Sequence, residues 1–320
     1  MKIAILTTSY PSRPGDAAGH FVETEARTLA AAGHDVTVIA PGRAAAGSRE
    51  RVERLPDFGL FGFPGAVSRL RERPVRALGA LRFALAASRT LRKLGPFDRV
   101  VAHWLVPSAW PVSLAVRAPL EVVAHGSDVA LLLALPRVAR VGIVRALLRR
   151  GARFRFVSAE LRERLADATL PELRDASQVA PCPIDLADTP PRELARIALS
   201  IGAEQRLVVI MARLVPGKRV GVALSAASLL PGAEVVVVGD GPEREALARS
   251  FPSARFAGQL ARPEALTWLA AADLLITASR IEGAPTVVRE ARQLGVPVVA
   301  AAAGDLEGWA KSDPELTVVP

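Results

Sequence analysis

Cysteine is almost absent from this sequence, which has only Cys182 among its 320 residues. One thiol cannot close an internal disulfide, and such scarcity is typical of a reducing compartment, so we expect a cytoplasmic protein. Long apolar runs are also missing, since no stretch approaches the roughly 20 residues that a membrane-spanning helix needs. The opening MKIAILTTSYP has a short apolar run without a small-residue cleavage site, and we expect a strand there rather than a signal peptide.

Several recognisable site patterns are missing as well. The cysteine and the four histidines have no metal-ligand spacing and form no H-x3-H pair, so we expect no metal and no other cofactor. No G-x-G-x-x-G follows the first apolar run, which argues against a nicotinamide dehydrogenase. Zinc-finger, RNP and helix-turn-helix signatures are absent and the basic segments have few aromatic residues, which argues against a nucleic-acid partner.

Positive charge is concentrated in the N-terminal half. Through Asp185, 27 Lys and Arg face 17 Asp and Glu, a net +10, whereas the remainder has a net −1. Residues 69–93 include eight basic residues and one acidic residue, and residues 137–155 include seven arginines and no acid. In the first segment, basic residues recur at helical spacing opposite apolar ones: Arg82, Arg89 and Lys93 against Phe83, Leu91 and Leu94. The pattern predicts either a solvated helix face or a basic amphipathic helix that rests weakly on anionic lipid.

Short apolar runs alternate with helical segments along the whole chain. A strand at 3–8, a helix at about 20–32 and a strand at 36–40 form a βαβ unit, and strands at 100–104, 120–124 and 154–157 follow. After a polar, proline-containing passage at 188–193, the alternation restarts with strands at 207–211 and 235–238. The pattern predicts an α/β fold of doubly wound parallel sheets in two domains, 1–187 and 188–320.

Two glutamates lie in a strand–loop–helix segment near the C-terminus. Glu282 is in the loop with Gly283 and Ala284, after the strand expected at 274–276, and Glu290 lies on the helix that follows. Open α/β sheets bind ligands at the carboxyl ends of their strands, and a helix start attracts phosphate. These groups suit a sugar, a diphosphate and a ribose, or else they fill a loop and flank an apolar stripe.

The expected helix directs Val287, Ala291 and Leu294 inward, and Arg289, Arg292 and Gln293 toward water. Glu290 falls on the margin of the apolar side. A carboxylate in that position is costly unless another group hydrogen-bonds it.

A second loop, in ARLVPGK, has two cations ahead of a helix start. Arg213 and Lys218 would meet a diphosphate with fixed positive charge, beside the free N–H groups of the helix. The alternative is two solvated loop cations.

Polar residues also follow the strands of the N-terminal half. His103, in HWLVP, and His125, in HGSD with Asp128, come at the ends of two apolar runs, and we expect both histidines at one edge of the sheet. Two histidines in one place favour a functional role over a structural one. Gly19, at the first helix start, lets a phosphate approach the backbone or is an ordinary loop glycine.

Together, HGSD, ARLVPGK and E-x7-E, followed by Gly-Val-Pro-Val-Val, resemble the motifs of family-4 retaining glycosyltransferases of the group 1 type, in the family's order. The resemblance implies the GT-B architecture, in which two Rossmann-like doubly wound domains face each other across a cleft. The N-terminal domain would bind the acceptor and the C-terminal domain the nucleotide sugar.

The resemblance also implies roles for individual residues. Glu282 contacts the donor sugar beside Gly283 and Ala284, and Glu290 binds the ribose hydroxyls. Arg213 and Lys218 stabilise the leaving nucleoside diphosphate, and Gly19 lies against it. On the acceptor or sugar side are His103, Asp128 and His125, and the catalytic set is His125, Arg213, Lys218 and Glu282.

The sequence departs from the family pattern at two places. Cys182-Pro183 replaces an Asn-Gly pair. The sequence stops at Val319-Pro320, on an expected strand, so the resemblance implies that the family's usual C-terminal helices are lacking.

The implied activity is a metal-independent hexosyl or N-acetylhexosaminyl transfer, with retention, from a UDP- or GDP-sugar to an acceptor hydroxyl. The expected setting is cell-envelope polysaccharide, glycolipid or glycoconjugate synthesis at the inner membrane face. The alternatives are a non-hydrolysing nucleotide-sugar epimerase and a truncated, non-catalytic protein that binds nucleotide sugars. An assay with donor alone separates the first alternative, because an epimerase converts the donor without an acceptor.

Overall fold

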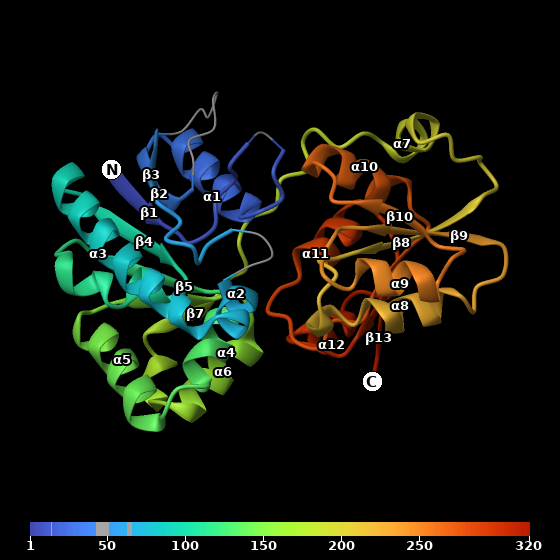
Figure 1. Cartoon of the computed structure of the whole chain (residues 1–320). Coiled ribbons are helices and arrows are strands. Elements are labelled where there is room, and N and C mark those ends of the chain that lie inside the picture. The colour runs from blue at the N-terminus through green and yellow to red at the C-terminus, as the bar shows by residue number, and fades with distance from the viewer. Residues whose placement is uncertain (14, 43–50, 63–65) are drawn as a thin grey trace. The chain divides into compact units, whose positions relative to one another are not determined.

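The computed structural model describes residues 1–13, 15–42, 51–62 and 66–320. The chain divides into two compact units, Met1–Pro183 and Ile184–Pro320 (Figure 1). The boundary expected between residues 187 and 188 falls in the segment that follows Pro183.

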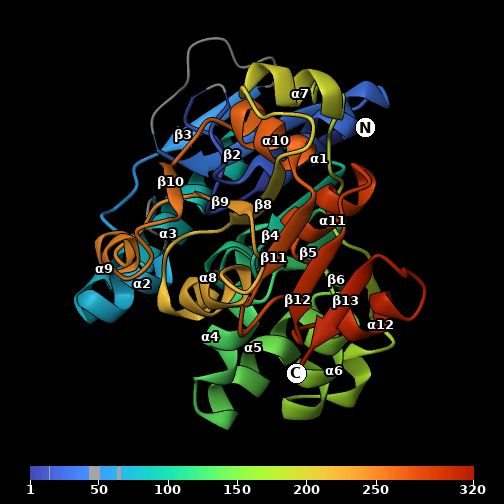
Figure 2. The ribbon, with the colours of Figure 1, turned by 90° about the vertical axis from the view of Figure 1, so that its right-hand side faces the viewer.

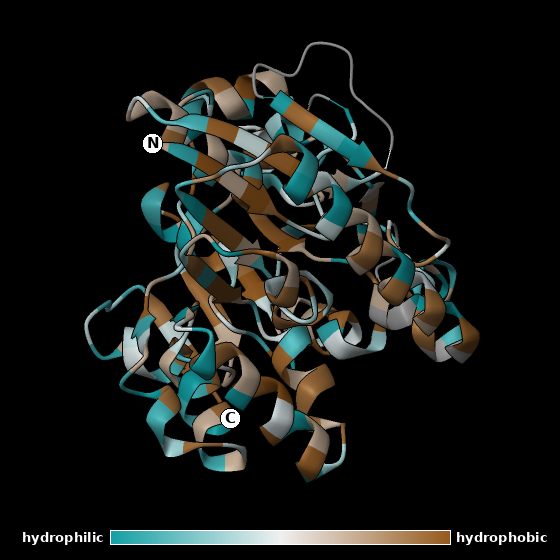
Figure 3. Ribbon diagram, turned by 90° about the vertical axis from the view of Figure 1, so that its left-hand side faces the viewer, coloured by the Kyte–Doolittle hydropathy of each residue, from teal (hydrophilic) through white to brown (hydrophobic). Residues whose placement is uncertain are grey.

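The N-terminal unit is a parallel sheet with strand order β3-β2-β1-β4-β5-β6-β7. Its strands are β1 Lys2–Leu6, β2 Asp35–Pro41, β3 Arg51–Leu55, β4 Arg99–His103, β5 Leu120–Ala124, β6 Arg153–Phe156 and β7 Ser177–Val179. Its helices are α1 His20–Ala31, α2 Ala66–Glu72, α3 Ala77–Leu94, α4 Ser127–Leu133, α5 Arg137–Arg149 and α6 Ala159–Ala168. The central strands are brown in Figure 3 because both faces of a parallel sheet are buried and take apolar side chains.

The C-terminal unit is a second parallel sheet, with strand order β10-β9-β8-β11-β12-β13 (Figure 2). Its strands are β8 Arg206–Met211, β9 Ala233–Val238, β10 Arg255–Gly258, β11 Leu274–Thr277, β12 Val298–Ala301 and β13 Leu316–Val319. Its helices are α7 Arg192–Ala198, α8 Val220–Ala227, α9 Arg244–Ser250, α10 Arg262–Ala271, α11 Thr286–Gln293 and α12 Leu306–Ala310.

Side chains of β8 alternate between two apolar cores. Leu207 and Val209 pack into the core that contains α10 and α11, whereas Val208 and Ile210 pack into the core that contains α8. Successive strand residues point to opposite faces, so a continuous apolar run is what a strand covered on both sides requires. The two doubly wound α/β units predicted from the alternation are therefore confirmed.

The basic segment at 69–93 forms α2 and α3, and α3 has the predicted two sides in most positions. Phe83 and Leu91 are buried, while Arg82, Arg89 and Lys93 are exposed. Sequence reasoning missed three leucines that are also exposed on α3: Leu78, Leu81 and Leu85. The exposed face of α3 is thus apolar toward its start and basic toward its end.

Helix α11 buries the predicted side and more. Ala291 lies in the core and Val287 and Leu294 pack against it, as expected. Val288 is also fully buried, and Glu290 is only 3% exposed rather than marginal. Arg292 does not point freely to water, since it pairs with Asp313 through Nε and Oδ2 at 2.7 Å. The burial of Glu290 requires a partner for that carboxylate.

Candidate active site

The strand order reverses once in each sheet, and the loops of interest lie at these reversals. In the C-terminal unit, β8 lies between β9 and β11, so the connections from β8 and β11 leave toward opposite faces (Figure 2). Loops that part in this way leave a crevice at the carboxyl ends of the strands, which is where open α/β sheets bind ligands. Lys218 follows β8 and Glu282 follows β11.

Lys218 and Glu282 are brought together as predicted for one site. The Lys218 ammonium pairs with Glu282 Oε1, although 64 residues separate them in sequence. Their loops are also joined through the backbone, because the Arg280 N–H donates to the Gly217 carbonyl at 3.0 Å. Arg213 lies exposed on the same loop as Lys218. The crevice therefore has two cations and one carboxylate on loops that are tied to each other.

The Lys218 loop lies directly on the loop after β9. The Ala212 N–H donates to Val238 O at 3.0 Å, and the Leu214 N–H donates to Asp240 O at 2.9 Å. Gly239 has φ of +136°, and a Cβ there would lie 1.9 Å from the Ala212 carbonyl oxygen. Only glycine permits this approach, which fixes the course of the loop with Arg213.

Glu290 has the partner that its burial requires. Arg262, at the start of α10, pairs with Glu290 Oε1 at 2.6 Å. Burial raises the pKa of the Glu290 carboxyl, and the charge of Arg262 opposes that rise. Gly283 and Ala284 lie between the two glutamates, and the Glu282 and Gly283 carbonyls press on Gly304, where a Cβ would come within 2.7 Å of both. Sequence reasoning did not identify Arg262.

In the N-terminal unit, His103 and His125 are also brought together. His103 ends β4 and His125 follows β5, and these strands are neighbours. His103 Nδ1 lies 3.0 Å from His125 Nε2, and the rings are within 16° of parallel. Trp104, at an unusual φ of +74°, packs against His125 with the ring centroids 4.7 Å apart and the rings tilted by 37°, so a strained backbone residue helps to hold this imidazole.

Asp128 faces the backbone of the same turn. Its Oδ2 accepts from the Leu105 N–H at 2.8 Å, and its Oδ1 accepts from the N–H groups of His125 at 3.0 Å and Gly126 at 2.9 Å. Burial raises the pKa of Asp128, and these hydrogen bonds oppose the rise. Asp128 therefore fixes the loops that carry the two histidines.

A buried ion-pair network that sequence reasoning missed lies behind the histidines. Arg155 on β6 pairs with Glu25 on α1, and with Glu121 on β5 at 2.7 Å. Glu25 Oε2 lies 3.8 Å from His103 Nε2. The sequence contains a pattern that could have identified these charges. Glu25 falls beside Val22 and Ala26 on the buried side of α1, and Arg155 lies between two phenylalanines of a buried strand. Charges in such places need partners.

Burial makes both imidazoles neutral at ordinary pH. Burial, and after it the charge of Arg155, lower the pKa of His103 to about 3. For His125, burial and then the neighbouring His103 hold the pKa well below 6.5, against the opposing charge of Glu25. Neutral imidazoles keep a lone pair, so this pair can accept a hydrogen bond or bind a metal ion.

Gly19 lies at the start of α1, in the loop after β1. It has φ of +72°, and a Cβ there would lie 2.3 Å from the Ser9 carbonyl oxygen. The absence of a side chain therefore serves the packing of the loop on itself. A contact between Gly19 and a phosphate stays a prediction.

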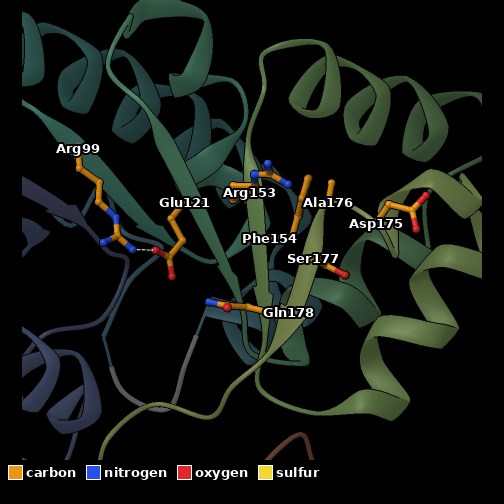
Figure 4. A pocket seen from close by; sticks show the side chains of 8 residues that line it. All are labelled: Arg99, Glu121, Arg153, Phe154, Asp175, Ala176, Ser177 and Gln178. Atoms are coloured by element: carbon orange, nitrogen blue, oxygen red, sulfur yellow. Dashed lines mark hydrogen bonds and ion pairs between the residues drawn. The ribbon is translucent and has the colours of Figure 1, made fainter.

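A pocket of about 360 Å³ lies at the opposite edge of the N-terminal sheet (Figure 4). Its lining comes from the amino ends of strands: Arg99, Glu121, Arg153, Phe154, Asp175, Ala176, Ser177 and Gln178. Arg99 and Glu121 pair with each other across it. Because ligands of open sheets bind at the carboxyl ends, this pocket is a poor candidate for the active site.

Comparisons with family models and with known proteins point to one family for this chain. Residues 18–188 match the family described as Glycosyltransferase Family 4, and residues 205–318 match Glycosyl transferases group 1. The chain is 31% identical, over its whole length, to a protein of Bacillus subtilis (strain 168) named as a teichuronic acid biosynthesis glycosyltransferase, TuaC, of which it covers 86%.

Two solved structures share the fold. Sucrose-phosphate synthase from Thermosynechococcus elongatus matches with a TM-score of 0.75 and 20% identity, covering all of this chain and 86% of that one. Anabaena HepE in complex with UDP matches with a TM-score of 0.70 and 19% identity, covering all of this chain and 85% of that one. Within the described residues, no helix is long and apolar enough to cross a membrane. The two Rossmann-like units thus have the GT-B fold, and the chain belongs to the group 1 glycosyltransferases of family 4.

Proposed function

We propose that this glycosyltransferase moves a sugar from a nucleotide-sugar donor to an acceptor hydroxyl with retention of anomeric configuration. The observation that carries the proposal is the pairing of Lys218 with Glu282 where the strand order of the C-terminal sheet reverses. A cation there suits a diphosphate, and a carboxylate beside it suits sugar hydroxyls. We assign the donor to the C-terminal unit and the acceptor to the N-terminal unit.

The donor is a UDP- or GDP-sugar in this proposal. HepE, which has a similar fold, was solved with UDP. Glu290 is the ribose ligand, and the charge of its partner Arg262 opposes the rise in pKa that burial causes. A hexosyl or N-acetylhexosaminyl group would then extend from the diphosphate toward Glu282, Gly283 and Ala284.

The chemical requirement is to neutralise the charge that develops on the departing diphosphate. Lys218 and Arg213 supply fixed positive charge, and the start of α11, an eight-residue helix, adds oriented N–H groups. These groups meet the electrostatic requirement from the chain's own side chains, so we propose a reaction without a metal cofactor. Glu282 orients the Lys218 ammonium as well as the sugar.

His125 acts on the sugar side of the reaction in this proposal. Its imidazole is neutral, is held by Asp128 through the backbone and packs against the tilted ring of Trp104. A neutral ring accepts or donates one hydrogen bond to a hydroxyl without adding a charge near the scissile bond. The named role of TuaC in teichuronic acid biosynthesis suggests an acceptor from cell-envelope polysaccharide or glycolipid synthesis.

The test is Lys218→Ala, with Lys311→Ala as the matched control because Lys311 is an exposed lysine of the same unit. Loss of one transition-state charge contact is expected to lower kcat/KM about 10²–10³-fold, measured as nucleoside diphosphate release. Lys311→Ala should stay near wild type. Near-wild-type turnover in Lys218→Ala would reject the assigned role.

The substrate is identified by thermal shift of the full chain against UDP, GDP, ADP and their sugars. We expect the nucleotide and the nucleotide sugar of one base to raise Tm well above those of the other bases. The Lys218→Ala variant should lose most of that shift. If no nucleotide raises Tm, the donor assignment fails.

We also propose that α3 holds the enzyme to an anionic membrane surface. Leu78 and Leu81 are 56% and 53% exposed, and Arg82 and Arg89 are exposed on the same helix. The leucines can enter the membrane interface while the arginines bind lipid phosphates. Each arginine would contribute about 1 kcal/mol to the free energy of membrane binding.

This contact is tested by co-sedimentation with phosphatidylglycerol and phosphatidylcholine vesicles at low and high salt. The Arg82→Glu/Arg89→Glu double variant should lose at least about 2 kcal/mol of binding to anionic vesicles. Arg249→Glu, an exposed arginine of the other unit, is the control. Equal binding to both lipids would contradict an electrostatic contact.

A further inference from the structure

Cys182 is the one cysteine of the sequence, and its buried thiol lies beside the two histidines. The Cys182 sulfur and one ring nitrogen each from His103 and His125 lie within 4.8 Å of one another. Two imidazole nitrogens and a thiolate are donors that zinc prefers. We propose that His103, His125 and Cys182 form a zinc site with three protein ligands and one open position.

The two ring nitrogens already face each other at nearly the required spacing. His103 Nδ1 and His125 Nε2 are 3.0 Å apart, whereas two nitrogen ligands on a tetrahedral zinc, each about 2.0–2.1 Å from the metal, lie roughly 3.3 Å apart. Between the free rings, one nitrogen must donate a proton to the other. On binding, that proton moves to the outer nitrogen of its ring, the thiol releases its proton to solvent, and no electron is transferred.

The carboxylate of Glu25 lies behind one proposed zinc ligand, His103. Glu25 Oε2 and His103 Nε2 are 3.8 Å apart, and neither atom has a hydrogen-bond partner among the described residues. Metal-bound histidines usually donate their other N–H to a carboxylate or carbonyl. Zinc on Nδ1 makes the Nε2 proton a stronger donor, so binding would close this gap and satisfy two buried polar atoms.

The surrounding charge permits a thiolate and a cation. Arg155 Nη1 lies 4.0 Å from the Cys182 sulfur and favours the thiolate form. The charge of Arg155 is matched by its ion pairs with Glu25 and Glu121, so an incoming ion does not meet uncompensated positive charge. Pro181 and Pro183 flank the cysteine and restrict its backbone, and of the three ligand residues His125 is the one that is partly exposed.

The three zinc ligands all belong to the N-terminal unit, whereas Lys218 and Glu282 belong to the C-terminal unit. In the free protein His125 Nε2 already faces His103, so a sugar hydroxyl would contact His125 Nδ1. Zinc on Nε2 fixes the proton of that ring on Nδ1, so the ring can then only donate to the sugar, a consequence that rests on the proposed function.

The full chain is titrated with cobalt(II), a spectroscopic probe for zinc. We expect one cobalt per chain, a thiolate-to-cobalt charge-transfer band, tetrahedral d–d absorption, and displacement of both by zinc. Cys182→Ser should abolish the charge-transfer band, His103→Asn should weaken binding, and Glu25→Gln should lower affinity about 10–100-fold. His34→Asn is the control, since His34 precedes β2 at the opposite edge of the sheet.

Absence of the band in the wild type, its survival in Cys182→Ser, or an equal loss in His34→Asn would overturn the proposal. If His103→Asn fails to fold by circular dichroism, Cys182→Ser still decides, because serine is nearly isosteric with cysteine. Thermal shift with UDP and GDP on the same preparations tests the nucleotide assignment separately, so either proposal can fail alone.

Discussion

At the scale of single residues, each carboxylate of the C-terminal site is held by a cation from another element. Glu282 pairs with Lys218 of the β8 loop, and Glu290 pairs with Arg262 of α10. Removing one partner of a buried pair leaves an uncompensated charge, which costs about 3–5 kcal/mol. Variants at these positions must therefore be read for folding as well as for activity.

Glu290→Gln is expected to weaken binding of the nucleoside diphosphate about tenfold, because a neutral amide is a poorer acceptor for ribose hydroxyls. Burial raises the pKa of Glu290, so protonation begins at a higher pH than in an exposed glutamate. Wild-type affinity should therefore fall more steeply than that of the variant when the pH is lowered from about 8 to about 5. Calorimetry at each pH measures this difference.

The control is Glu245→Gln, on the exposed side of α9, where the glutamate has a solvated i,i+4 partner in Arg249. It should change stability by less than about 0.5 kcal/mol. Parallel pH profiles for wild type and Glu290→Gln would show that this carboxylate does not contact the ligand.

At the scale of elements, α7 is a helix that sequence reasoning did not predict. The sequence indicates a polar, proline-containing passage at 188–193 between the two domains, and the helix begins within its last two residues, at Arg192. Its arginines dock it on the C-terminal core: Arg192 pairs with Asp273, and the buried Arg196 donates to Ala271 O at 3.0 Å and lies 3.3 Å from Asp273. Polar composition therefore did not mean a solvated segment.

Arg196→Ala should lower the free energy of unfolding of the C-terminal unit by about 3 kcal/mol, since several buried carbonyls lose their donor. Arg249→Ala, in an exposed i,i+4 pair, should change it little. Urea denaturation followed by Trp268 and Trp309 fluorescence measures both. Equal effects of the two substitutions would contradict the docking role of α7.

The same contacts give a pH dependence. Burial would raise the pKa of Asp273, but the Leu207 N–H, Arg192 and Arg196 together lower it below 3.8. The folded state therefore binds this proton less readily than the unfolded chain. The stabilisation is present above pH 3.8 and is lost as the pH falls through the lowered pKa, and Asp273→Asn should flatten that part of the acid-unfolding curve.

The features that the sequence predicted are those that depend on a local pattern of residues. The apolar runs predicted most strands, because a strand buried on both faces must be apolar throughout. The candidate site residues Lys218, Glu282 and His125 were predicted from their place after strands and from the family resemblance. Partners distant in sequence, such as Arg262 for Glu290 or Arg155 for Glu25, were not, since no local periodicity encodes which strand or helix will lie opposite.

At the scale of the whole molecule, the chain consists of two units with separate sheets and, in the sequence, opposite signs of net charge. Each unit has its own apolar core, so each should unfold in its own transition. Tryptophan reports on both, because Trp104 and Trp110 lie in one unit and Trp268 and Trp309 in the other.

We expect two denaturation transitions, only one of which responds to the nucleotide that binds. At a concentration of about 100 times Kd, the ligand should add about 2.7 kcal/mol to the C-terminal unit alone. Replacing Trp104 and Trp110 with phenylalanine isolates that unit's signal, and replacing Trp268 and Trp309 isolates the other. A shift of equal size in both signals would contradict donor binding by one unit.

The C-terminal sheet keeps its apolar and its charged residues in different places. The apolar side chains of β8 pack into two cores, whereas the loops after β8 and β11 hold Lys218 and Glu282. Substitutions in these loops can therefore change which substrate is accepted without removing core contacts, and substitutions in the cores can change stability without altering the charged groups.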